Sequence, residues 1–233
     1  MDGPRLRTRG RDRARQGATL ASQPRDSARP RDLVRLDDVT ASAAGAQPHD
    51  ATITYPGGLR ARWRWAGSGQ GRAVFALSEA GGTLVDHGML VSSDPEALCR
   101  AELRIDGPGG SWSVRLASTI YDEPAGLLWD DPGLFIVKYG FHTYALEARS
   151  GVLRWSHRSA TPLLAVVASP RLAHVIAQAE IETFALEEDG TVAWRIAHSD
   201  VVTEVELIGG RLVLTSFGGQ VSALDPATGR PTG

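Results

Sequence analysis

One pattern returns twice in the second half of the chain, and it constrains the fold more than any other feature of the sequence. Three segments share the pattern: residues 143–155 read TYALEARSGVLRW, residues 183–194 read TFALEEDGTVAW and residues 221–231 read VSALDPATGRP. The aligned Ala145, Ala185 and Ala223 are separated by 40 and 38 positions. A period in this range is typical of stacked modules that bury their apolar faces against one another.

Each module divides into short β-strands. Four runs of β-forming residues alternate with turns between residues 126 and 155, four more between 163 and 196, and three between 203 and 224. Upstream, ATITYPGGLRARWRW from Ala51 predicts a hairpin with its turn at Pro56 to Gly58. Further strand patterns follow at residues 71–79, 82–92, 98–105 and 111–117. The chain is therefore predicted to be all-β, because no segment of helical period interrupts these runs.

A glycine recurs at the turn before the last strand of each module, called here the glycine corner, and it suggests how the modules close. Glycines at such corners are separated by 52, 41, 39 and 39 positions, and they are Gly58, Gly110, Gly151, Gly190 and Gly229. We expect residues 59–65 to pair with strand 221–224 and to supply the strand that the last module lacks. The predicted fold is a small β-propeller of about four four-stranded antiparallel blades, with the last blade closed by this N-terminal strand. Two alternatives stay open: the chain is part of a larger propeller, or it is an open array completed by a second copy.

Composition separates a tail from this domain. Residues 1–35 carry ten Arg and four Asp, a net charge of +6, whereas the remaining residues carry 15 basic and 23 acidic side chains, a net charge of −8. We predict a disordered Arg-rich tail over residues 1–48, because it lacks Trp, Phe and Tyr, and a β-propeller domain over 49–233. Because the acidic domain repels phosphate, nucleic acid is not an expected partner for it. One Lys against 24 Arg is typical of a GC-rich coding sequence, so we expect a bacterial protein.

The sequence also limits compartment and redox chemistry. No apolar run has the length of a membrane span or a signal peptide, so we expect a soluble, cytoplasmic protein with no membrane partner. Cys99 is the single cysteine, which excludes an internal disulfide and a cysteine-based zinc site.

The runs Ala145-Leu-Glu with Gly151 and Trp155, and Ala223-Leu-Asp-Pro-Ala-Thr-Gly229, resemble the repeat of pyrroloquinoline-quinone-type propellers. That family carries an Ala-x-Asp-x-x-x-Gly-x-x-x-Trp signature in an architecture like that of WD40 and YVTN propellers. The resemblance implies that the glycine closes the turn between the third and fourth strands and that the tryptophan docks against a neighbouring blade. The residues to which these structural roles carry over are Gly151, Trp155, Gly190, Trp194 and Gly229.

The resemblance implies fold more strongly than activity. Quinone-dependent dehydrogenases of the family hold their cofactor with a Trp floor, a calcium carboxylate cluster and often a disulfide between adjacent cysteines. One cysteine cannot supply that disulfide, and we expect no cofactor and no metal. Other relatives are non-enzymatic scaffolds, among them an outer-membrane assembly lipoprotein.

Loops at one end of a propeller are the candidate binding surface. These are the loops that join the second strand of a blade to the third and the loops that join each blade to the next. They bring together the candidate ligand-binding residues, which are Tyr139, His142, His157, Arg158, His198, Asp200 and Phe217. His142, His157 and His198 come from separate loops, so we predict no metal site. His174 stands among apolar residues and is expected to be a hydrogen-bonded core histidine.

The first functional hypothesis is a non-enzymatic propeller scaffold that binds an unknown protein or a small polar ligand through this loop face. It is expected to be a monomer or a dimer that completes the propeller. The alternative is an enzyme, either a degenerate quinoprotein-type oxidoreductase or a hydrolase. Saturable binding of pyrroloquinoline quinone with calcium, together with dye reduction, would favour the oxidoreductase.

Overall fold

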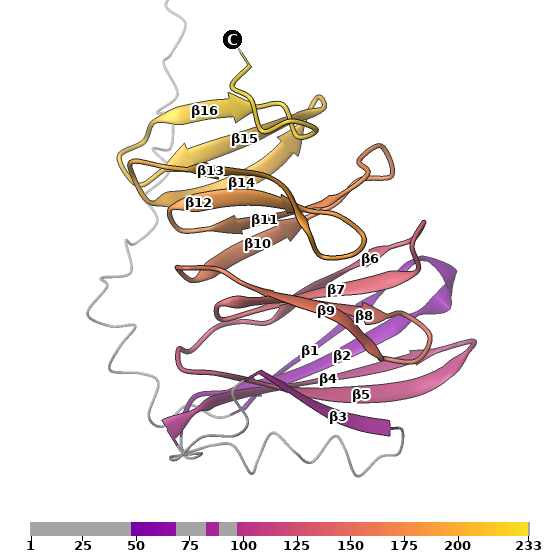
Figure 1. Cartoon of the computed structure of the whole chain (residues 1–233). Coiled ribbons are helices and arrows are strands. Elements are labelled where there is room, and N and C mark those ends of the chain that lie inside the picture. Colours follow the sequence, from indigo (N-terminus) through magenta and orange to yellow (C-terminus); the bar gives the residue numbers. More distant parts are fainter. Residues whose placement is uncertain (1–47, 69–82, 89–96, 233) are drawn as a thin grey trace, which may run out of the picture. The chain divides into compact units, whose positions relative to one another are not determined.

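The computed structural model describes residues 48–68, 83–88 and 97–232, in which almost every regular element is a β-strand. These residues form sixteen strands in four sheets that follow one another in chain order (Figure 1). The predicted all-β fold is therefore confirmed. The predicted tail, apart from Pro48, and the predicted strand 71–79 lie outside the described residues, so the domain boundary stays a prediction.

Sheet 1 is built on the predicted hairpin, whose turn is a 3-10 element, η1 (Pro56–Gly58). Gly57 and Gly58 have φ values of 72° and 78°, which glycine adopts without a steric penalty. The antiparallel strands of the sheet are, in spatial order, β1 (His49–Thr54), β2 (Arg60–Ala66), β4 (Cys99–Gly107) and β5 (Gly110–Ser118). A fifth strand, β3 (Thr83–Gly88), pairs in parallel with the outer side of β5.

The predicted closure of the last blade by residues 59–65 is wrong. Strand β2 lies between β1 and β4 and is hydrogen-bonded to both, so neither of its edges is open to the strand at 221–224. The pattern of glycine, leucine and tryptophan at the start of β2 is the same as at the end of a module. This local pattern does not specify which strand lies alongside it, and here it begins the second strand of the first sheet.

The three later modules fold as three antiparallel sheets. Sheet 2 contains β6 (Ala125–Trp129), β7 (Leu134–Tyr139), β8 (His142–Glu147) and β9 (Leu153–Arg158), and sheet 3 contains β10 (Leu163–Val167), β11 (Val175–Ala179), β12 (Glu182–Leu186) and β13 (Val192–Ala197). Sheet 4 has the three predicted strands β14 (Val202–Ile208), β15 (Arg211–Ser216) and β16 (Val221–Leu224). An isolated bridge between Leu224 and Pro231 follows β16.

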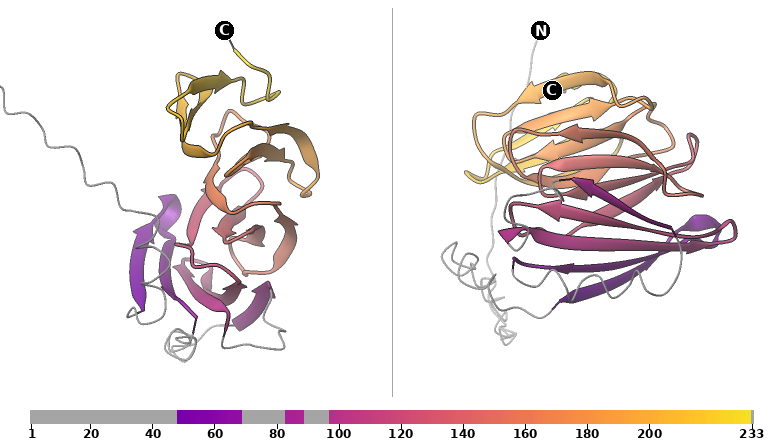
Figure 2. Two further views of the ribbon diagram at one scale, coloured as in Figure 1. Left: turned by 90° about the vertical axis from the view of Figure 1, so that its left-hand side faces the viewer. Right: turned by 60° about the horizontal axis from the view of Figure 1, so that its bottom comes forward.

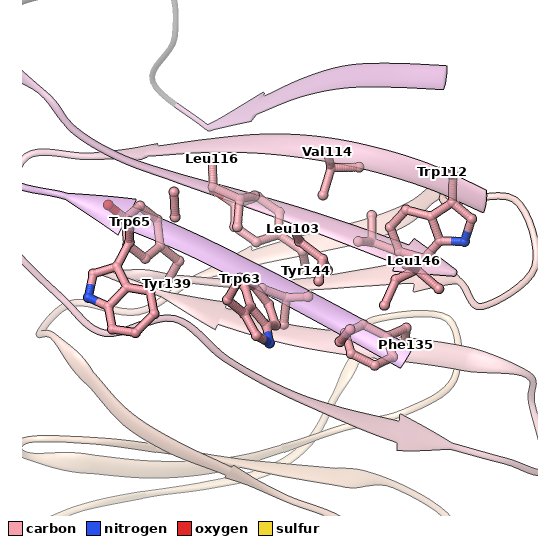
Figure 3. Packing of buried hydrophobic residues seen from close by; sticks show 14 residues of the cluster. Trp63, Trp65, Leu103, Trp112, Val114, Leu116, Phe135, Tyr139, Tyr144 and Leu146 are labelled. Atoms are coloured by element: carbon pink, nitrogen blue, oxygen red, sulfur yellow. The ribbon is translucent and has the colours of Figure 1, made fainter. Parts of the chain in front are cut away.

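Large and small side chains alternate on the third strand of each module, as the sequence indicates. On β8, Tyr144 and Leu146 pack toward sheet 1, and Ala145 packs toward sheet 3. On β12, Phe184 points back toward sheet 2 and Ala185 toward sheet 4. The cluster between sheets 1 and 2 brings together Trp63, Trp112 and Phe135, all at most 2% exposed (Figure 3). Each such side chain contributes about 1.5–3 kcal/mol when it is buried, so the three clusters hold the sheets in sequence (Figure 2).

A second contact joins successive sheets at their glycine corners. The Trp112 ring lies against Gly151, the Trp155 ring against Gly190 and the Trp194 ring against Gly229. In each pair the indole Nε1 also donates a hydrogen bond into the same corner, and the acceptors are the carbonyl oxygens of Ala148, Glu188 and Pro226, at 3.0, 2.7 and 3.2 Å. The tryptophan that ends one module therefore docks on the corner of the following module.

Glycine is required at these corners for two reasons. Gly190 has a φ of 86°, and a Cβ atom there would lie 2.6 Å from Cγ of Trp155. Gly210, in the turn before β15, has a φ of 79° but nothing within 4 Å of the same position. The two glycines share the backbone constraint, and only Gly190 also carries the packing constraint.

We expect Gly190→Ala to destabilise the protein more than Gly210→Ala does. Both variants pay about 1–2 kcal/mol for a left-handed alanine, and Gly190→Ala adds about 1–3 kcal/mol of overpacking against Trp155. Urea unfolding followed by tryptophan fluorescence measures both costs. Equal costs for the two variants would show that the indole ring does not constrain the corner.

Candidate functional site

The predicted loop face exists at one end of sheets 2 to 4. It consists of the loops that join the second strand to the third in each sheet and the connections from each sheet to the next. In the structure these segments are residues 119–124, 140–141, 159–162, 180–181, 198–201 and 217–220. Backbone hydrogen bonds tie two of the connections to neighbouring loops, for example from Ser159 N to Phe141 O (2.9 Å) and from His198 N to Ile181 O (2.8 Å).

Two aspartates fix the shape of this face. Asp122 accepts a hydrogen bond from Gly140 N (2.6 Å) and forms an ion pair with Lys138 Nζ (2.7 Å) that is largely buried. Asp200 accepts from Gly218 N (2.8 Å) and from Val201 N (2.8 Å). Asp200, predicted as a ligand-binding residue, therefore holds the loop of sheet 4. The hydrogen bond from Gly218 is the main cause that lowers the pKa of its carboxyl.

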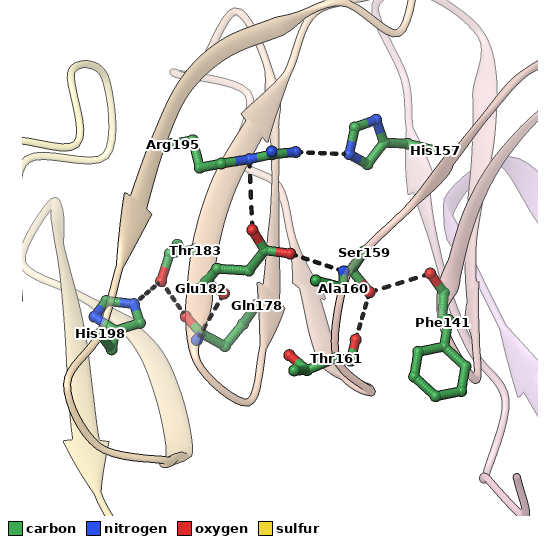
Figure 4. Close-up of polar contacts among 10 residues, drawn as sticks. All are labelled: Phe141, His157, Ser159, Ala160, Thr161, Gln178, Glu182, Thr183, Arg195 and His198. Carbon is green, nitrogen blue, oxygen red and sulfur yellow. Dashed lines mark hydrogen bonds and ion pairs between the residues drawn. The ribbon is translucent and has the colours of Figure 1, made fainter.

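A charged cluster lies between sheets 2 and 3 (Figure 4). Glu182, at the start of β12, is only 9% exposed; its Oε1 accepts a hydrogen bond from Ala160 N (3.1 Å) and its Oε2 lies 3.5 Å from Arg195 Nε. Arg195 also places Nη2 3.1 Å from Nε2 of His157. Because a guanidinium group can only donate, His157 accepts through Nε2 and is neutral in this arrangement.

Aromatic rings hold the cationic side chains of this cluster in place. The guanidinium carbon of Arg195 lies 5.5 Å from the Phe184 ring centroid, and the His157 ring centroid lies 4.8 Å from the same centroid. Arg158 lies over Phe141 at 5.9 Å. Such cation–π contacts fix where the charges are presented to solvent. A cavity of about 430 Å³ opens here, lined by Arg158, Ser159, Ala160, Glu182 and Arg195.

The two histidines near this cavity are neutral at pH 7. His142 stacks on Tyr144, and its pKa is lowered first by burial and then by the positive charge of Arg158. Burial likewise lowers the pKa of His157, with a further contribution from Arg195 and an opposing one from Glu182. Both side chains therefore gain positive charge only below the usual histidine range.

The third predicted histidine belongs to a separate network. The hydroxyl of Thr183 donates to Gln178 Oε1 (2.5 Å) and accepts from His198 Nε2 (2.6 Å). Gln178 in turn donates from Nε2 to the backbone carbonyls of Ala179 and Glu182. With every polar group of Gln178 engaged, the network positions the β11–β12 loop, and His198 lines a second cavity of about 210 Å³.

The structure brings some of the predicted ligand-binding residues together beside this face and buries one of them. His142, His157 and Arg158 lie together, and Phe217 projects from the β15–β16 loop with 74% of its surface exposed. Tyr139 is a correction: it is fully buried in the cluster between sheets 1 and 2, because it ends the second strand on the face that packs toward sheet 1. Core residue His174 forms the expected hydrogen bond, with Nε2 2.7 Å from Pro226 O.

Glu182 and Arg195 were missed. The repeat period contains a signal for Glu182, since it follows His142 by the same 40 positions that separate Ala145 from Ala185. Arg195 gives no such signal, because its role depends on a contact between two sheets. The described residues contain no group of three or more His, Cys, Asp or Glu side chains that could hold a metal ion.

A larger cavity lies at the opposite ends of the strands. Its volume is about 940 Å³, and turn residues of sheets 1 and 2 line it, including Pro108, Asp130, Asp131 and Arg149. Half of its sixteen lining residues are glycine or proline, and its charged residues are Asp130, Asp131, Glu147 and Arg149. This cavity shows no set of convergent side chains comparable with the cluster around Glu182.

Comparisons with known proteins found solved structures that are similar to the chain. The solved structures that resemble it include that of BamB from Moraxella catarrhalis, with 17% identity and a TM-score of 0.45, over 81% of this chain and 51% of that one. A HIRA fragment matches with 11% identity and a TM-score of 0.45, over 82% of this chain and 54% of that one. The chain therefore spans about half the length of these structures. No curated protein matches, and no helix among the described residues could span a membrane.

The match to a family model is more extensive. The model described as outer membrane protein assembly factor BamB matches residues 111–232, which is more than half of the chain. The matched region begins in β5 and contains all three tryptophan and glycine corners. With its repeated sheets and corners, the chain belongs to the family of outer membrane protein assembly factor BamB, whose PQQ-like repeats build β-propellers.

Proposed function

We propose that this protein is a non-enzymatic β-propeller scaffold that binds an acidic segment of a partner protein through the loop face. The observation that carries the proposal is the cavity between sheets 2 and 3, where Arg158 and Arg195 flank the buried Glu182 carboxylate. The ion pairs found among the described residues include none for Arg158. The separation of 3.5 Å between Arg195 and Glu182 leaves Arg195 hydrogen-bonding capacity for a ligand.

The neighbouring groups support a carboxylate ligand rather than a cationic one. Two arginines face one glutamate, so the cavity keeps a positive charge at pH 7, although the chain has a net charge of −2. Arginine binds carboxylates in a planar, bidentate geometry. Exposed Phe217 on the same loop face supplies an aromatic contact of the kind that anchors protein interfaces.

The binding test uses a fluorescein-labelled hexaglutamate peptide and fluorescence anisotropy at low salt. Arg158→Glu is expected to raise the dissociation constant at least about tenfold, because it replaces attraction by repulsion at the cavity. Arg171→Glu is the matched control: Arg171 is exposed in the turn between β10 and β11, away from the cavity, and its reversal should leave binding nearly unchanged. Equal binding by the wild type and Arg158→Glu, or tighter binding of hexalysine, would contradict the proposal.

Binding is also expected to depend on pH. The lowered pKa values of His142 and His157 leave both rings neutral at pH 7.5, and each gains a proton as the pH falls below about 6.5. Affinity for hexaglutamate should therefore increase between pH 7.5 and pH 5.5, where most of the peptide carboxylates are still ionised. The double variant His142→Gln/His157→Gln should lose most of this increase. An unchanged pH profile in that variant would remove these histidines from the site.

A further inference from the structure

Sheet 4 ends the series of sheets in Figure 1, and one of its faces has no neighbour among the described residues. The pairing of the strands in sheets 3 and 4 identifies the residues of this face. Val213 pairs with Ala223 as Ile176 pairs with Ala185 in sheet 3. Ile176 and Ala185 are fully buried against sheet 4, whereas Val213 and Ala223 are partly exposed. The uncovered face of sheet 4 therefore keeps the residue types that the preceding sheet uses for packing.

The exposure of larger side chains supports the same conclusion. Among the residues whose burial the structure describes, the three most exposed large hydrophobic side chains are Phe217, Val221 and Ile208, at 74%, 64% and 54%. All belong to sheet 4 or its loop. Side chains of residues paired across two antiparallel strands lie on the same face. By this rule one face, called here the terminal face, carries Glu204, Glu206, Ile208, Arg211, Val213, Thr215, Val221 and Ala223.

The other end of the series does not match this face. The rear face of sheet 1 carries charged residues in register, with Arg62 opposite Arg104 and Arg64 opposite Glu102. Ion pairs already occupy part of it, for example Arg62 with Asp106 at 2.7 Å. Glu102 is fully buried and Arg104 is only 8% exposed, so the charges of this face are already largely out of contact with water. The rear face of sheet 1 is therefore not an open apolar surface on which the terminal face could stack. The bulky rear faces of sheets 2, 3 and 4 are each covered by the preceding sheet.

The charges of the terminal face complement themselves. Glu204 and Glu206 lie on β14, and Arg211 lies on the adjacent β15. All three are exposed, and the ion pairs of the described residues include none of them. In a two-fold interface, a residue i that contacts j of the partner is matched by j contacting i. Arg211 of each copy can then meet the glutamates of the other around the apolar centre at Val213.

We propose that two copies of this chain associate through their terminal faces about a two-fold axis. Within the chain, the rear face of each later sheet packs on the preceding sheet. The two-fold association instead packs two identical faces on each other, with the terminal face of the second copy as the next layer. The surface is formed by the strands of sheet 4, so it is separate from the cavity around Glu182.

Sedimentation velocity of the full chain over a wide concentration range tests the proposal. The wild type should form a concentration-dependent dimer. Arg211→Glu and Glu206→Arg should each raise the dimer dissociation constant at least about tenfold, because each places like charges opposite one another. The combined Arg211→Glu/Glu206→Arg variant should restore dimerisation, because it exchanges the two signs.

Circular dichroism checks that these surface variants stay folded, and Arg171→Glu serves as a control that should dimerise like the wild type. A wild type that is monomeric at all concentrations would overturn the proposal. So would a dimer that neither single reversal weakens, or a double reversal no stronger than the single ones.

Discussion

The contact on which the rest of the structure depends is the docking of an indole ring on a glycine corner. At each junction the ring occupies the space that a Cβ atom would fill, and its Nε1 donates to a carbonyl of the same corner. One residue of sheet n thus supplies both an apolar and a directional contact to sheet n+1. Because a hydrogen bond fixes orientation and apolar burial does not, the corner sets the relation between sheets that the larger clusters then stabilise.

That relation places the loop face. Residues of the charged cluster come from different sheets: His157 lies in β9, whereas Glu182 begins β12 and Arg195 lies in β13. Their separations of 3.1 and 3.5 Å follow from the packing of sheet 2 on sheet 3. The Arg195 guanidinium and the neutral His157 ring both rest on Phe184, a residue of the core between these sheets. The cavity is therefore as rigid as the junction beneath it, which is the property that a preorganised binding site needs.

The sequence predicted features whose cause is local and failed where the cause is a contact between distant segments. The hairpin at Pro56, the glycine corners and the alternation of Tyr144 with Ala145 follow from turn chemistry and the two-residue period of a strand. Closure by residues 59–65 failed because a strand pattern does not identify its neighbour, and β4 pairs with that edge of β2. Tyr139 was misplaced since one position at a strand end decides between core and solvent, and Arg195 was missed because only the packing of two sheets gives it a role.

The two ends of the series differ in a way that bears on assembly. The rear face of sheet 1 carries charged residues in register, and Glu102 and Arg104 on it are already buried. The terminal face of sheet 4 is different: it keeps valine and alanine, partly exposed, at the positions where the preceding sheet has buried isoleucine and alanine. A face that keeps these residue types is suited to packing against another sheet, and the mixed charges around Val213 discriminate between the sheets that could pack there.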